Sequence, residues 1–431
     1  MRKKSLLLTV LILLTCIVLQ AQEERHSFSL KQAKEYAREN SYLLKNSKAD
    51  IEVAKKKVWE TTAQGLPQAN IEGSYTYMPN VPDIVKSFTP EGVEPTLWGA
   101  SMDIKVTQLL FSGAYIVGVQ ASKTYRNITT LLEKKNVDDV IESVINSYVL
   151  VLIAEENKSI LETTYKNLSR ILVEVTAMNK EGFVEDTDVD QLQLTVTNIE
   201  SSLSMLNRQL ELANRLLKFQ IGMDMASELK LTDSLNDLIV SSNLETMSNM
   251  NFDVQSNISY KLADNQEKIS HLSLKLSKTE FLPTIAAFYN HNENFNDKAF
   301  NMNPADLLGF SVSIPIFSSG QRIAKVGQAR IAYEKAKTDK IQATQGLFLE
   351  YEQSRTNYLT SLDKYKNSRV SMKLSEKIYN KTTIKYKEGV SSSLDLTQTQ
   401  NQYLQAQSDY YGSVLDLFKN KNKLDKIIIK H

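Results

Sequence analysis

The stretch KEGFVEDTDV at residues 180–189 recurs as KEGVSSSLDL at residues 387–396, with Lys, Glu, Gly and Asp at equivalent positions. In each copy the glycine follows a long segment without proline, and an aspartate comes shortly after it. Glycine at a helix end allows the left-handed conformation that terminates the helix. An aspartate in the next first turn complements the helix dipole. Each copy therefore predicts a turn between two helices.

The two turns belong to a longer internal repeat. GLPQANIEGSYTYM at 65–78 precedes DIKVTQLLFSGAY at 103–115, and FLPTIAAFYNHN at 281–292 precedes GFSVSIPIFSSGQ at 309–321. A fixed order of such segments marks a tandem repeat. We expect a first repeat at 22–221 with its tip turn at 180–188, a linker at 222–254, a second repeat at 255–425 with its tip turn at 387–395, and a tail at 426–431.

Alternating apolar and polar residues predict two strands in each repeat. Ile71 and Tyr75 fall on one face of the first strand, and Glu72 and Thr76 fall on the other, so the polar face is in contact with water. Because closing a membrane barrel takes at least about eight strands, four strands are too few and several copies must pool theirs. The expected strands cover about 68–78, 98–111, 284–292 and 307–317.

Long helices are expected between the strands and the turns. The chain has no proline from 113 to 182 or from 320 to 386, and each stretch would form a helix roughly 100 Å long. Shorter helices at about 187–221 and 394–425 follow, the first with the apolar spacing of a coiled coil. A short helix before the strands and one after the turn together match the long helix in length, so they can lie beside it end to end.

The N-terminus predicts a secretory signal peptide at 1–21. Arg2, Lys3 and Lys4 precede an apolar run and then Ala21, with cleavage expected after Ala21 or the next residue. The alternative, a membrane anchor, requires about 20 apolar residues, more than this run contains. Cys16, the single cysteine, lies inside the segment, and a lipidated Cys16 is the second alternative.

Composition and motifs argue against catalysis and against nucleic acid. Lys and Arg number 51 and Asp and Glu 50, so the chain lacks the basic excess of a nucleic-acid-binding protein. The sequence has no phosphate-binding glycine loop, GxSxG or HExxH, and its four histidines are not in ligand spacing. We therefore expect no enzyme, no cofactor and no metal site.

The signal peptide, the doubled order of helix, strand, strand, long helix, turn and helix, and the Leu-Pro before the strands together resemble the TolC family of outer-membrane efflux channels. The resemblance covers about residues 28–425. It implies a mainly α fold with a β-barrel portion: a homotrimer whose chains contribute four strands each to a barrel in outer-membrane lipid, continued by a helical tunnel in the periplasm of a Gram-negative bacterium.

The same resemblance implies a function. The chain would be the passive exit duct of a tripartite efflux pump or a type I secretion system, served by a periplasmic adaptor (membrane fusion) protein and an inner-membrane transporter. The alternative is a periplasmic coiled-coil adaptor or scaffold without a pore, which the strands with a water-facing side and the doubling do not fit. A soluble enzyme ranks third.

The resemblance also assigns gate residues. Asp395 occupies the position of an aspartate ring that narrows the tunnel entrance, and Tyr386 and Asp188 occupy the positions of a latch that closes it. Ser391 stands where an arginine is expected, and Gln398 stands where a second acid is expected. This chain should therefore have a weaker latch and a single charged ring.

The glycines of the turns have a second implied role. In the family these turns are where the adaptor docks, which assigns Gly182 and Gly389 to the docking region. Their structural role as helix terminators would by itself explain both residues, and we assign both roles to them. Likewise, Asp188 and Asp395 could serve the helix dipole alone.

Overall fold

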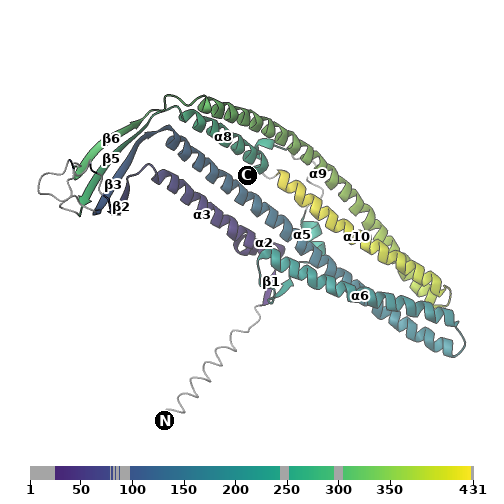
Figure 1. The fold of residues 1–431 in the computed structure, drawn as a ribbon. Helices are drawn as coiled ribbons and strands as arrows, with labels where there is room; N and C mark the ends of the chain where they lie inside the picture. Colours follow the sequence, from purple (N-terminus) through teal and green to yellow (C-terminus); the bar gives the residue numbers. More distant parts are fainter. Residues whose placement is uncertain are drawn as a thin grey trace, which may run out of the picture. The chain divides into compact units, whose positions relative to one another are not determined.

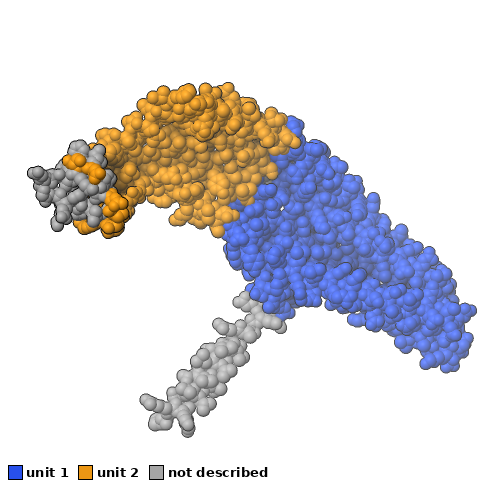
Figure 2. Space-filling view, in the orientation of Figure 1, with its two compact units in different colours: residues 1–47, 133–258, 345–431 blue, residues 48–132, 259–344 orange. Residues whose placement is uncertain are grey.

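The computed structural model describes residues 25–77, 98–242, 252–295 and 304–428, together with residues 79, 80, 83 and 87. The expected signal peptide, including Cys16, lies outside these ranges, as do most of the loop after residue 77 and the last three residues. The chain forms two compact units, which Figure 2 colours separately: unit 1 (residues 1–47, 133–258 and 345–431) and unit 2 (residues 48–132 and 259–344).

The elements occur twice in the same order, as Figure 1 shows, which confirms the mainly helical repeat with four sheet strands. The first set is α2 (Leu30–Asn40), α3 (Tyr42–Ala63), β2 (Gln68–Tyr77), β3 (Trp98–Ser112), α5 (Gly113–Lys180) and α6 (Asp186–Ile221). The second set is α8 (Ile258–Thr279), β5 (Thr284–Asn294), β6 (Asp306–Ser313), α9 (Gln321–Lys387) and α10 (Ser393–Ile428). The remaining elements of the described ranges are β1 (Arg25–Phe28), β4 (Glu228–Leu231), α7 (Leu235–Ser241) and a 3₁₀ turn (Val254–Ser256).

Unit 2 contains a four-stranded antiparallel sheet in the order β2-β3-β5-β6. Ile71 of β2 pairs with Ile104 of β3, and Tyr75 pairs with Ala100, so apolar residues share one face. That face is open in the single chain, with Ile71 68% and Phe310 74% exposed. β2 and β6 form the two edges of the sheet. β6 ends before the expected residue 317, because Pro315 lacks the N–H that a ladder needs.

An ion-pair network joins α8 to α9 within unit 2. Lys340 Nζ lies 2.6 Å from Asp264 Oδ1 and 2.9 Å from Glu267 Oε2, and all three side chains are less than a third exposed. Asp264 also pairs with Lys268, one helical turn further along α8. Ion pairs among two acids and two lysines thus hold α8 against α9.

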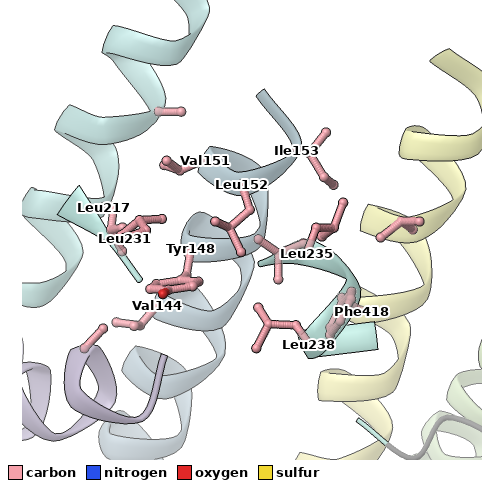
Figure 3. Packing of buried hydrophobic residues seen from close by; sticks show 14 of the residues in the cluster. Val144, Tyr148, Val151, Leu152, Ile153, Leu217, Leu231, Leu235, Leu238 and Phe418 are labelled. Carbon is pink, nitrogen blue, oxygen red and sulfur yellow. The ribbon is translucent and has the colours of Figure 1, made fainter. Parts of the chain in front are cut away.

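The main apolar core of unit 1 surrounds Tyr148, which has no exposed surface. Figure 3 shows Tyr148 of α5 among Leu231 of β4, Leu235 of α7 and Leu217 of α6. β4 pairs in parallel with β1 at the start of the described chain. The sequence pattern does not predict this pair of strands, because a strand of four residues is too short to show a period of two.

The expected single helix before the strands is interrupted at Ser41. Ser41 takes an extended ψ of 130°, and its N–H ends α2 by donating to Ala37 O. The backbone of Gly222, which closes α6 with a φ of 75°, packs against this break. A Cβ at Gly222 would lie 2.2 Å from Asn40 O, so the interruption of one helix makes room for the end of another.

Candidate functional site: the paired helical turns

The two KEG turns have the same backbone geometry. In the first, Gly182 has a φ of 79°, its N–H donates to Asn179 O at 2.9 Å, and the N–H of Phe183 donates to Met178 O at 3.0 Å. These two hydrogen bonds form the Schellman motif, which ends a helix. The second turn repeats it around Gly389, which has a φ of 73°. Neither glycine has a heavy atom near its missing Cβ, so only the positive φ requires glycine.

Asp395 closes a reciprocal capping box at the start of α10. Its Oδ2 accepts from Ser392 N at 3.1 Å, and its own N–H donates to Ser392 Oγ at 3.1 Å. The hydroxyls of Ser391 and Ser392 donate to the same Oδ2. The backbone N–H of Ser392 first, and then these hydroxyls, lower the pKa of Asp395. Its carboxylate is exposed and stays negative at neutral pH.

The first turn is built differently. Glu185 precedes α6 without a side-chain capping bond, and Asn179 takes over part of that role. Its amide donates to Val184 O at 2.9 Å and to Asp186 Oδ1 at 2.8 Å. The divergence of the two sequences therefore changes the cap but not the turn.

Asp188 links the two turns through Ser393. The hydroxyl of Ser393 donates to Asp188 Oδ1 and lies 3.3 Å from Gln191 Oε1. Ser393 is buried, so this bond between α6 and α10 is shielded from water. Further along the same two helices, Thr195 and Thr397 bring their hydroxyls to 3.4 Å.

The structure brings Tyr386 into the same region as Asp188. Burial first, and then the negative charge of Asp188, raise the pKa of Tyr386. Asp188 accepts a hydrogen bond from Ser393. Within the described residues, no hydrogen bond joins Asp188 to Tyr386. Ser393 was not identified from the sequence as a site residue. The sequence does indicate a capping role for its neighbour Ser392, because Ser-x-x-Asp is the pattern of a capping box.

Gln398 is exposed one helical turn beyond Asp395. It lines a shallow groove on α10 together with Leu394, Thr397, Asn401, Gln402 and Gln405. The position at which the resemblance implies a second acid is thus an amide on an open surface.

The helices behind the turns are held by an apolar cluster in unit 1. Leu168 and Leu192 are buried on the α5 and α6 side, and Tyr379 and Tyr403 stack with ring centres 5.7 Å apart on the α9 and α10 side. These contacts set the spacing of the hairpins that carry the turns.

In the described part of the chain, no group of His, Cys, Asp and Glu is arranged to hold a metal ion. Among the described helices, none combines the length and apolarity needed to cross a membrane.

Residues 272–428 match the family model described as "Outer membrane efflux protein". The chain has no significant match among curated protein sequences.

Solved outer-membrane channels match nearly the whole chain at low identity. CusC is 16% identical with a TM-score of 0.76, covering 94% of this chain and 92% of its own. The outer membrane channel CmeC of Campylobacter jejuni is 16% identical with a TM-score of 0.75, covering 93% and 85%. The outer membrane protein VceC of Vibrio cholerae is 16% identical with a TM-score of 0.73, covering 93% and 95%.

These matches confirm the predicted TolC-family resemblance. Residues 272–428 match the model of the outer membrane efflux protein family, and nearly the whole chain has the fold of these outer-membrane channels.

Proposed function

We propose that three copies of this chain form an outer-membrane channel that is the passive exit duct of a tripartite efflux pump or a type I secretion system. The observation that carries the proposal is the four-stranded sheet, whose β2 and β6 edges are unpaired and whose apolar face is open. An unpaired sheet edge presents backbone N–H and C=O groups that can pair with another strand. Three copies joined edge to edge close a barrel whose apolar face meets lipid.

The paired turns support a gate in the proposed tunnel. In the proposed trimer, three copies of Asp395 around the axis attract cations and repel anions, as charged rings do in pores. Asp188 and Tyr386 are proposed to hold the entrance closed, with Ser393 as the direct partner of Asp188. Gln398 lies next to Asp395 without adding charge.

The tips of the turns are proposed as the adaptor docking region. Phe183 follows Gly182 and is 80% exposed, and Val390 follows Gly389 and is 75% exposed. Two apolar side chains presented on rigid turns suit a protein partner. An inner-membrane transporter would supply the energy, because the proposed channel is a passive duct.

One experiment separates this proposal from the alternative of a periplasmic adaptor or scaffold without a pore. Membranes are fractionated, the protein is extracted in detergent, and its mass and its conductance in planar bilayers are measured. A trimer from the outer membrane that conducts ions is expected. A soluble monomer without conductance would reject the channel.

A further inference from the structure

A cavity of about 390 Å³ lies between α5, α6 and α10 in unit 1. Its volume is within the range of small-molecule sites, which is roughly 300–1,000 Å³. Nearer the paired turns, the hydroxyls of Thr195 and Thr397 join α6 to α10. Ser202 and Leu404, which line the cavity, lie about two helical turns further along the same two helices. The cavity is therefore built by three helices of one chain.

The wall of the cavity is largely aliphatic and carries no charge. Met205, which is 52% exposed, is flexible and can adapt to occupants of different shape. No described residue that lines the cavity is charged. An occupant should therefore be uncharged, because a charge without a partner is costly to remove from water. The aliphatic side chains are Ile153 and Leu161 of α5, Met205 and Leu206 of α6, and Leu404 and Leu415 of α10.

Gln407 of α10 lines the cavity with one unpartnered oxygen. The residue is only 3% exposed, and its Nε2 donates to Asn157 Oδ1 of α5 at 3.0 Å. Its Oε1 has no hydrogen-bond partner among the described residues. Buried polar atoms are nearly always paired, and an unpaired one costs free energy. An O–H or N–H group of an occupant would supply the missing hydrogen bond.

Gly412 leaves α10 without a side chain where the helix borders the cavity. It lies in the interior of α10, where glycine is less favourable than alanine. Its φ is not positive, and a Cβ at this position would have no heavy atom within 4 Å. Neither the backbone conformation nor close packing therefore requires glycine. The glycine instead leaves space between Ser408 and Leu415, its neighbours on the same helix face.

We propose that this cavity binds a small uncharged molecule with an apolar ring and one hydrogen-bond donor, of the chemical class of phenols and aryl alcohols. The ring occupies the space beside Gly412 and packs against the ring of Tyr411, and the hydroxyl donates to Gln407 Oε1. Water alone would satisfy Oε1 but would leave the aliphatic wall hydrated, which is unfavourable. None of the lining residues belongs to the paired turns, so this site goes beyond the proposed channel function.

The test titrates 4-fluorophenol into the full chain, held in amphipol so that no detergent occupies the cavity, and follows the fluorine NMR signal of the probe. Saturable binding, stoichiometric with the chain, is expected. The probe 4-fluoroanisole has nearly the same shape but no donor, and it should bind about three- to tenfold more weakly, the effect of one hydrogen bond. In Gln407→Leu the two probes should bind equally. The control Gln402→Leu changes an exposed glutamine of α10 outside the cavity and should keep the preference for the phenol.

Filling the cavity provides a second test. Gly412→Leu places a side chain in the open space and should abolish saturable binding, while thermal stability is kept or raised because leucine favours a helix more than glycine does. The matched control is Gly346→Leu on α9. Gly346 is exposed, a Cβ there would also have no heavy atom within 4 Å, and the residue does not line the cavity. This variant should keep both its stability and its binding of 4-fluorophenol.

Any of four outcomes would overturn the inference. These are a wild-type signal that does not saturate with 4-fluorophenol, equal affinity of the wild type for 4-fluoroanisole, unchanged binding in Gly412→Leu, and an equal loss of binding in the two glycine variants. The channel function is tested separately by conductance, and none of these outcomes bears on it.

Discussion

Tyr148 and Asp233 meet in the core of unit 1, with Tyr148 Oη 3.1 Å from Asp233 Oδ2. The same hydroxyl lies 2.9 Å from Phe28 O, and Asp233 Oδ2 also accepts from Leu30 N at 2.7 Å. Burial raises the pKa of Tyr148, so its hydroxyl remains a donor. Two side chains thereby tie the start of the described chain to α5 and to the segment before α7.

Removing the Tyr148 hydroxyl should destabilise unit 1. Tyr148→Phe keeps the ring but leaves buried acceptors without their donor, which costs about 1–3 kcal/mol. The free energy of unfolding in denaturant at fixed protein concentration measures the loss. Tyr125→Phe is the control, because the Tyr125 side chain is 54% exposed and its change should cost little. Equal stability of the two variants would contradict the role assigned to the contact.

Two glycines with the same backbone conformation should differ in their tolerance of alanine. Gly182 and Gly222 both have positive φ, which costs about 1 kcal/mol in any other residue. A Cβ at Gly182 would have no heavy atom within 4 Å, whereas a Cβ at Gly222 would lie 2.2 Å from Asn40 O. Gly222→Ala should therefore lower the free energy of unfolding by at least about 2 kcal/mol more than Gly182→Ala. Similar costs would show that the break after Asn40 can shift.

The repeat was predictable because its signals are local. Leu-Pro before each strand, alternation within the strands and glycine at the turns all act within a few residues, so the order of elements follows from the sequence. The break at Ser41 could not be predicted in this way. No proline or glycine marks it, and it depends on packing against Gly222, far along the chain.

The candidate site was predictable only in part. The positions of Asp395 and Tyr386 followed from the family resemblance, whereas the bond from Ser393 to Asp188 joins residues 205 positions apart. Such a bond depends on how α6 and α10 pack, and a sequence pattern does not report packing. The Asp233 contact, 203 positions from Leu30, was missed for the same reason.

The ion pairs between α8 and α9 should make part of the stability depend on pH. Burial alone would raise the pKa of Asp264, but hydrogen bonds from Lys268 and Lys340 outweigh it and lower that pKa. A carboxylate with a lowered folded pKa stabilises above its unfolded pKa and loses this contribution as pH falls through the folded value. Stability should therefore drop below about pH 4.

The measurement compares the free energy of unfolding at pH 7 and at pH 3.5 in wild type and in Asp264→Asn. The variant should lose about 1 kcal/mol at pH 7, since the pair is partly exposed, and should show a shallower fall with pH. The exposed pair Glu52–Lys55 offers a control in Glu52→Gln, which should behave like wild type. An unchanged pH profile in Asp264→Asn would show that the network does not set the pH dependence.

Breaking the bond between the two turns should loosen the proposed gate. Ser393→Ala removes the donor that Asp188 uses, so the closed entrance should open more often and the mean conductance in planar bilayers should rise. Ser391→Ala is the control, because its hydroxyl contacts Asp395 and not Asp188. Tyr386→Phe should raise the mean conductance less than Ser393→Ala does. If Tyr386→Phe opens the channel and Ser393→Ala does not, the latch is the tyrosine.

Asp395 has two roles that substitutions can separate. Asn at this position keeps an oxygen that can accept from Ser392 N, whereas Ala loses both the cap and the charge. Asp395→Asn should therefore lower the cation preference without changing thermal stability, and Asp395→Ala should lower both. Because the pKa of Asp395 is lowered, the charge and its effect on selectivity should persist as pH falls and disappear only below about pH 4. If Asp395→Asn leaves selectivity unchanged while Asp395→Ala destabilises the fold, Asp395 is a capping residue and not a ring of the pore.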